Sequence, residues 1–254
     1  MSETPDAQES FMSHLIELRT RLMRAIIAVV LVVLVLFPFA KDIYALLAQP
    51  LLRVLPSGST MIATDVTGTF LVPLKVTLMA AFLVALPYVL FQAWAFVAPG
   101  LYHHEKRLVV PVLVSSFLFF LLGMSFAYFF VFPIAFGFFA GYAPVGVQMM
   151  TDIDKYLSFV LTMFIAFGLT FETPVVVVVL VRMRVVSLDK LKSIRPYVIV
   201  GAFVMGAIFT PPDVISQCML ALPLWLLYEL GLQLARFVTV PAAEGAEEAS
   251  EPVN

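Results

Sequence analysis

Long apolar runs recur along this sequence, and they restrict its fold more than any other feature. A helix needs roughly 20 apolar residues to cross a bilayer core of about 30 Å, and the runs at 74–98 and 157–181 are long enough. Inside lipid a chain must satisfy its own backbone hydrogen bonds, and an α-helix does so within a single segment. Hydrophobic residues make up 62% of the chain and charged residues only 13%, about half the charged share of a soluble domain. The sequence therefore predicts an all-α polytopic membrane protein.

Six apolar segments are predicted to be transmembrane helices. The Pro211-Pro212 pair separates the last two, because proline cannot donate to a helix and restricts the residue before it. The fifth segment has about 14 residues and reaches only about 21 Å, so short fifth and sixth helices are expected, with either added flanks or a locally thinned bilayer. The predicted segments lie near 23–40, 74–98, 109–133, 157–181, 197–210 and 214–235, in a domain of residues 23–236 between an N-terminal segment with an amphipathic helix (1–22) and a disordered acidic tail (237–254).

Basic residues are concentrated on one side of the predicted helices. Such residues near the ends of spans mark the cytoplasmic side, so we expect both termini to face the cytoplasm, as an even number of spans requires. The cytoplasmic side would hold Arg19, Arg21, Arg24, Lys106, Arg107, Arg182, Arg184, Lys190, Lys192, Arg195 and Arg236, and the other side Lys41, Arg53, Lys75 and Lys155.

Two acidic residues on the predicted cytoplasmic side are candidates for binding. Glu17 lies on the polar face of an amphipathic segment, where it can form an i,i+4 pair with Arg21 or bind a partner. Glu105 has basic neighbours directly after it, which cannot easily face it on a helix. Its carboxylate is therefore either a solvated loop charge or free for an outside partner, and the sequence leaves both open.

Glu172 lies inside the apolar stretch FGLTFETPVVVVVL, residues 167–180. A charged side chain near the centre of a bilayer costs roughly 2.5–3.5 kcal/mol, so such a group loses its charge, finds a partner or lines a wet cavity. One interpretation is a structural hydrogen bond at a kink made by Pro174. The other is a polar site for a substrate or another subunit.

A second polar group surrounds the Pro-Pro turn. Asp213 is expected to cap the following helix by accepting backbone N–H bonds. Gln217 would then face lipid, and polar side chains in membrane helices tend to mark helix–helix contacts.

The sequence contains none of the common catalytic motifs. It has no GxxxxGK[ST] phosphate loop, no GxSxG elbow and no zinc motif, so we expect no enzyme activity, metal or cofactor. The net charge of −2 implies no attraction to nucleic acid, and the single cysteine, Cys218, is expected to pack in an apolar run.

Five motifs in order resemble the TatC family, whose members are the core subunit of the twin-arginine protein translocase. They are SHLIELRTRL, FVAPGLYHHEKR, FVFPIAFGFF, SFVLTMFIAFGLTFETP and RPYVIVGAFVMGAIFTPPDVISQ, and the similarity covers about residues 11–237. The resemblance implies a glove-like bundle of six helices in the bacterial cytoplasmic (inner) membrane. It also implies recognition of twin-arginine signal peptides and export of folded proteins with the single-span partners TatA and TatB, driven by the proton gradient, in a complex that holds several copies of the chain.

The same resemblance assigns residues to roles. It implies a signal-peptide patch of Leu15, Glu17, Arg19, Phe96, Pro99, Leu101, Glu105 and Arg107, an intramembrane polar site at Glu172, partner contacts at Thr210 and Gln217, and outer-side roles for Pro50 and Asp213. A proton-coupled secondary transporter would also use an intramembrane glutamate and remains the alternative. Against it, the sequence shows no internal repeat of the kind common in such transporters.

Overall fold

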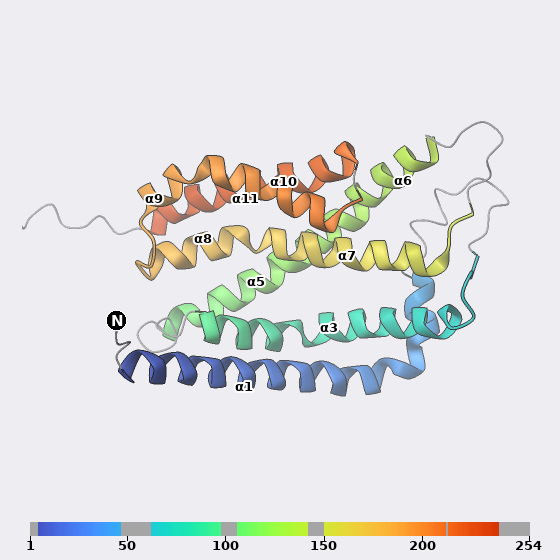
Figure 1. Ribbon diagram of the computed structural model, residues 1–254, viewed down its shortest axis with the longest axis horizontal. Coiled ribbons are helices and arrows are strands. Elements are labelled where there is room, and N and C mark those ends of the chain that lie inside the picture. The colour runs from blue at the N-terminus through green and yellow to red at the C-terminus, as the bar shows by residue number, and fades with distance from the viewer. Residues whose placement is uncertain (1–4, 47–61, 98–105, 142–149, 212, 239–254) are drawn as a thin grey trace, which may run out of the picture.

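The computed structural model describes residues 5–46, 62–97, 106–141, 150–211 and 213–238. Within these ranges the regular structure is helical apart from an isolated β-bridge between Ile62 and Asp152. Most helices run along the long axis of the molecule, while the rod of α5 and α6 crosses them at an angle (Figure 1). The elements are α1 (Pro5–Leu36), η1 (Phe37–Phe39), α3 (Gly68–Val97), α5 (Lys106–Phe126), the π-turn η2 (Ala127–Val131), α6 (Phe132–Gly141), α7 (Ile153–Phe171), α8 (Thr173–Arg182), α9 (Leu188–Ser193), α10 (Arg195–Phe209) and α11 (Val214–Val238).

Five helical rods in the described part of the chain are long and apolar enough to cross a membrane. They are Met12–Leu46, Gly68–Val97, Val109–Phe139, Ile153–Arg182 and Val214–Phe237. The fifth predicted segment is the shorter apolar helix α10, with 15 residues. The sixth helix is not short as expected, because α11 continues for 25 residues and includes Glu229 and Arg236. Glu229 is tolerated there because it pairs with Arg195, with 2.7 Å between Oε2 and Nη2.

The third predicted segment extends further than the sequence suggested. The predicted helix ends near 133, but α6 continues to Gly141. Pro133 has no N–H to donate and its ring clashes with a regular preceding turn. The five-residue π-turn η2 comes directly before it, and the N–H of Phe132 reaches back to the carbonyl of Ala127. This wider turn accommodates the proline, so the helix bends and continues where a sequence reading ends it.

The fourth segment is a rod with a break at Glu172. α7 ends at Phe171, α8 begins at Thr173, and Pro174 occupies the first turn of α8, where its missing N–H costs little. The two helices run end to end (Figure 1). The predicted kink is therefore present, and it places Glu172 at the junction between two helices.

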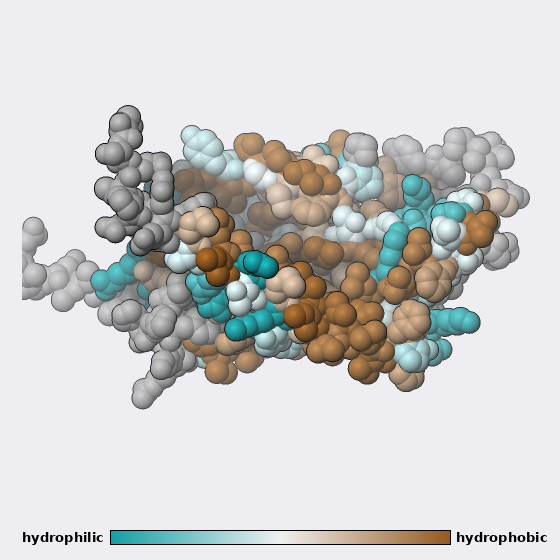
Figure 2. All heavy atoms as spheres, turned by 60° about the horizontal axis from the view of Figure 1, so that its bottom comes forward, coloured by the Kyte–Doolittle hydropathy of each residue, from teal (hydrophilic) through white to brown (hydrophobic). Residues whose placement is uncertain are grey.

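The main core lies where α5, η2 and α6 cross α7. It is rich in buried aromatic rings, among them Phe120, Phe132 and Phe167. Glycines permit the close approach: a methyl group on Gly123 would lie 2.4 Å from the Phe167 carbonyl oxygen, and one on Gly168 would lie 2.5 Å from the Phe120 ring. Figure 2 shows hydrophobic side chains gathered across the middle of one face and hydrophilic ones toward its ends. This distribution is typical of a protein whose central surface contacts lipid.

Candidate functional site

A contact between α1 and α3 forms the first part of the candidate site. The two helices are antiparallel neighbours (Figure 1). The ring of His14 stacks on that of Phe96, with centroids 4.3 Å apart. The contact brings the N-terminal motif next to the last turn of α3, and α5 begins at the same end of the molecule. The fold thus places the first motif and the two described ends of the second motif at one end of the molecule.

The predicted signal-peptide residues divide between described and undescribed positions. Leu15, Glu17 and Arg19 lie on α1, Phe96 lies in the last turn of α3, and Arg107 lies in the first turn of α5. The remaining predicted residues, Pro99, Leu101 and Glu105, lie outside the described residues, as does Pro50.

Glu17 forms the predicted i,i+4 ion pair with Arg21. Its Oε1 accepts hydrogen bonds from Arg21 Nη2 at 2.5 Å and from Nε at 2.9 Å. Both side chains remain partly open to solvent, 38% for Glu17 and 24% for Arg21. A partly exposed helix pair of this kind stabilises by only about 0.3–0.5 kcal/mol. A second guanidinium could therefore approach Glu17 at little cost to the fold.

Gln92 is a polar residue at this site that the sequence reading missed. It is only 4% exposed, and its Oε1 has no hydrogen-bond partner among the described residues. Glu17 lies one helical turn after His14 on α1, and Gln92 lies one turn before Phe96 on α3. Because α1 and α3 are antiparallel, the two residues lie at a similar height along the pair. The sequence signal that could have identified Gln92 is a single glutamine within the apolar segment 74–98.

Glu172 is buried with both carboxylate oxygens unpartnered among the described residues. The residue is 7% exposed. Ser116 on α5 lies close enough to interact with the carboxylate but makes no well-formed hydrogen bond to it. Ser116 Oγ instead accepts a hydrogen bond of 2.8 Å from Trp94 Nε1 on α3. Since its oxygen is engaged as an acceptor, the Ser116 hydroxyl proton is left for a second partner. The structural hydrogen bond considered for Glu172 is therefore absent from the described residues.

The polar residues at the turn between α10 and α11 make contacts within the chain. Asp213 caps α11, as predicted, through a 2.7 Å bond from the Ser216 N–H. Gln217 Nε2 donates to the Phe203 carbonyl of α10 at 2.9 Å. Thr210 is buried, and its hydroxyl donates to the Gly206 carbonyl at 2.8 Å. The expected helix–helix contact of Gln217 thus joins α10 to α11.

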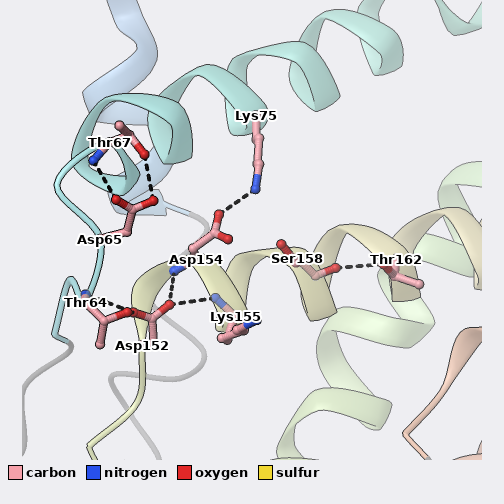
Figure 3. Close-up of polar contacts among 9 residues, drawn as sticks. All are labelled: Thr64, Asp65, Thr67, Lys75, Asp152, Asp154, Lys155, Ser158 and Thr162. Atoms are coloured by element: carbon pink, nitrogen blue, oxygen red, sulfur yellow. Dashed lines mark hydrogen bonds and ion pairs between the residues drawn. The ribbon is translucent and has the colours of Figure 1, made fainter.

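A polar network holds the opposite end of the bundle together (Figure 3). Asp152 accepts hydrogen bonds from the hydroxyl and N–H of Thr64, at 2.5 and 3.0 Å, and it caps α7. Lys75 on α3 pairs with Asp154 on α7 at 2.5 Å. The Thr64 hydroxyl and the N–H groups of Lys155, Thr64 and Asp154 lower the pKa of Asp152 to about 2. The network fixes the start of α3 against the start of α7.

Comparisons with known proteins agree with this geometry. The family model described as Sec-independent protein translocase protein (TatC) matches residues 13–223. The chain is 55% identical over 229 residues to the TatC protein of Escherichia coli (strain K12), covering 90% of this chain and 89% of that protein. It is 41% identical over 228 residues to the TatC protein of Aquifex aeolicus (strain VF5), covering 89% and 94%.

A solved structure shows the same architecture. The crystal structure of the twin arginine translocase receptor TatC superposes with a TM-score of 0.79 at 41% sequence identity, over 89% of this chain and 100% of that one. From the match of motifs, fold and sequence along nearly its whole length, the chain belongs to the TatC family of Sec-independent protein translocase proteins.

Proposed function

We propose that this translocase component is the receptor for twin-arginine signal peptides and the scaffold on which TatA and TatB assemble to export folded proteins. The observation that carries the proposal is the partly exposed Glu17 carboxylate. It is held in a weak pair with Arg21 beside the His14–Phe96 contact. An arginine of the signal peptide would take the place of Arg21 at this carboxylate. The exchange therefore buries no additional charge.

The chemistry favours arginine over lysine at such a carboxylate. A guanidinium forms two parallel hydrogen bonds to a carboxylate, whereas an ammonium group acts as a point charge. Two consecutive arginines then require two acceptors. In this proposal Glu17 supplies one and Glu105, in the second motif, supplies the other, with Leu15, Arg19, Phe96, Pro99, Leu101 and Arg107 shaping the patch.

Glu172 is the second part of the proposal. Its unpartnered carboxylate, buried at the α7–α8 junction, is a polar group that a signal peptide or a partner helix can satisfy within the bilayer. In this proposal the single-span partners dock on α10 and α11 near Thr210 and Gln217, whose hydroxyl and amide N–H bond to carbonyls of α10, and Pro50 and Asp213 act on the outer side. The proton gradient drives transport, and both termini face the cytoplasm.

Peptide binding to the purified full-length protein tests the receptor function. A twin-arginine signal peptide and its twin-lysine counterpart are titrated at two salt concentrations, because exposed charge pairs are screened by salt. We expect the arginine peptide to bind about tenfold more tightly, the difference expected for one charged hydrogen bond. Glu17→Gln and Glu105→Gln should each remove most of this preference.

The matched control is Asp189→Asn. Asp189 is a 91% exposed carboxylate at the same end of the bundle, paired with Lys192. The Asp189→Asn variant should keep the preference for the arginine peptide unchanged. Equal binding of both peptides to the wild type would contradict the proposal. The buried, unpartnered Glu172 would then favour a proton-coupled transporter, which a solute-uptake assay with the protein alone would test.

A further inference from the structure

A cavity lies between α5, α8 and α11, apart from the signal-peptide residues. Its volume is about 410 Å³, within the range of about 300–1,000 Å³ found for ligand pockets. Its lining includes Pro111 and Phe119 of α5, Val175 and Val178 of α8, and Leu234 of α11, with Arg182 as its charged residue.

The cavity offers apolar surface along its length. Ser115 also lines it, but the Ser115 hydroxyl donates to the Val112 carbonyl at 2.9 Å and so is already engaged. Arg182 is the last residue of α8 and therefore lies at the end of that helix. The cavity thus combines an apolar channel with a guanidinium at one end.

Among the described residues around this end, basic side chains outnumber carboxylates. Arg184 is exposed just beyond α8, and Arg236 is exposed beside Phe237, which lines the cavity. Two carboxylates at this end are already paired, Asp189 with Lys192 at 2.8 Å and Glu229 with Arg195 at 2.7 Å. The local excess of positive charge favours an anionic ligand. A guanidinium has five N–H donors, so Arg182 can keep a contact within the chain and still bind a phosphate.

The length of the cavity indicates what kind of apolar ligand would occupy it. Along α8 the lining runs from Pro174 to Arg182, about 12 Å of helix, close to the roughly 15 Å of one leaflet of a 30 Å core. This length suits one hydrocarbon chain, and Arg182 at the end of the lining suits a charged headgroup.

We propose that this cavity is a binding site for an anionic phospholipid, with an acyl chain between α5, α8 and α11 and the headgroup phosphate on Arg182. Basic pockets between membrane helices on the cytoplasmic side are a known means of binding such headgroups. The bound lipid joins α8 and α11 to α5.

Lipid retention on the purified full-length protein tests the site. Native mass spectrometry counts bound phosphatidylglycerol and phosphatidylcholine of identical acyl chains. The wild type should retain one phosphatidylglycerol in preference, and Arg182→Gln should weaken it about tenfold, the loss expected for one charged hydrogen bond. Val178→Phe fills the cavity and should weaken the binding of both lipids.

Two matched variants separate this site from lipid that merely surrounds the protein. Arg184→Gln removes an exposed charge at the same end, and Val176→Phe enlarges an exposed side chain on the same helix. Neither residue lines the cavity, so Val176→Phe should leave retention unchanged, and Arg184→Gln should lower it much less than Arg182→Gln does. If Arg182→Gln matches Arg184→Gln, or if Val178→Phe matches Val176→Phe, the proposal is wrong and the lipid binds only as an annulus.

A second readout works even if a variant fails to fold. Trp94 packs in one cluster with Val175 and Val179, which line the cavity. In a Trp225→Phe background, phosphatidylglycerol with brominated chains should quench Trp94 fluorescence more than the brominated phosphatidylcholine does. Equal quenching by the two lipids would overturn the proposal. No signal peptide takes part in these measurements, so their outcome is independent of the proposed receptor function.

Discussion

At the scale of single residues, the hydrogen bond between Trp94 and Ser116 connects the end of α3 to the surroundings of Glu172. Trp94 lies two residues before Phe96 of the proposed peptide patch, and Ser116 lies beside the buried carboxylate. Hydrogen bonds between membrane helices contribute about 0.6 kcal/mol on average and up to about 1.7 kcal/mol. We expect Trp94→Phe and Ser116→Ala each to lower the free energy of unfolding by about this amount, plus the cost of lost packing.

A double-mutant cycle isolates this bond from packing losses. The double variant should be less destabilised than the sum of the single variants, since either change alone removes the bond. Unfolding in detergent micelles by added denaturing detergent provides the measurement. Trp225→Phe combined with Ser116→Ala serves as the control cycle and should be additive. Additivity in the Trp94 cycle as well would show that the two side chains act separately.

At the scale of helices, two glycines set the distance between α5 and α7. A β-carbon on Gly123 would meet the backbone of Phe167 at 2.4 Å, and backbone within a packed helix cannot swing aside. Overpacking a core costs typically about 1–3 kcal/mol, so Gly123→Ala should lower the free energy of unfolding by an amount near the upper end of that range. Gly168→Ala should act in the same direction, because the Phe120 ring it meets is only 1% exposed.

Gly201 provides the matched control on α10. A β-carbon there would meet nothing within 4 Å, and alanine is a better helix former than glycine by up to about 1 kcal/mol. Gly201→Ala should therefore leave the unfolding midpoint unchanged or raise it. If Gly123→Ala proved as harmless as Gly201→Ala, the two helices would have room that the structure does not give them.

The cap of α7 should make stability sensitive to acid. Four hydrogen bonds lower the pKa of Asp152 from 3.8 to about 2. Because this pKa is lower in the folded state than in the unfolded state, the carboxylate stabilises the fold above about pH 4. That contribution is lost as the pH falls through the interval from about 4 to about 2.

Unfolding midpoints measured across this interval for the wild type and Asp152→Asn would test the acid sensitivity. The variant should be less stable at neutral pH and should lose less stability in acid. Asp65→Asn is the comparison. The Thr67 hydroxyl and N–H also lower the pKa of Asp65, but these bonds lie within one turn and do not join distant segments. An Asp152→Asn curve parallel to that of the wild type would mean that the cap contributes nothing in this window.

At the scale of the whole molecule, the sequence predicted what depends on local composition and spacing. The all-helical fold, the i,i+4 pair of Glu17 and Arg21, the Asp213 cap and the break near Pro174 follow from neighbours in the chain, and the structure confirms each of them. Features that depend on distant segments were not predictable. The approach of Ser116 to Glu172, the burial of Gln92 and the lipid-sized cavity all require knowing which helices touch.

The ends of two helices differ from those predicted from the sequence. Pro133 was taken as the end of a helix, but the π-turn before it lets the helix continue. The sixth helix was expected to be short, but α11 runs for 25 residues, and its Glu229 is paired with Arg195 of another helix. At Pro133 the backbone compensates for the proline, and in α11 a neighbouring helix supplies the partner of Glu229.

The number of membrane crossings depends on α10. Its 15 residues span about 22 Å, less than a bilayer core of about 30 Å. If α10 crosses, the chain makes six crossings and both termini lie on one side. The start of α1 and the end of α11 do lie at one end of the molecule (Figure 1). If α10 does not cross, the residues before and after it face the same compartment.

Labelling of single cysteines decides between these topologies, in a background where Cys218 is replaced by alanine. Val66, Val185 and Val214 are 91%, 61% and 76% exposed and lie before α3, before α9 and at the start of α11. With basic residues inside, a membrane-impermeant maleimide should label Val66→Cys and Val214→Cys from outside intact spheroplasts, and Val185→Cys only after permeabilisation. The labelling of Val214→Cys relative to Val185→Cys decides whether α10 crosses, because the two positions lie on either side of α10 in the chain. If it were labelled together with Val185→Cys, α10 would not cross, and the C-terminal end of α11 would face the opposite compartment from the N-terminal end of α1.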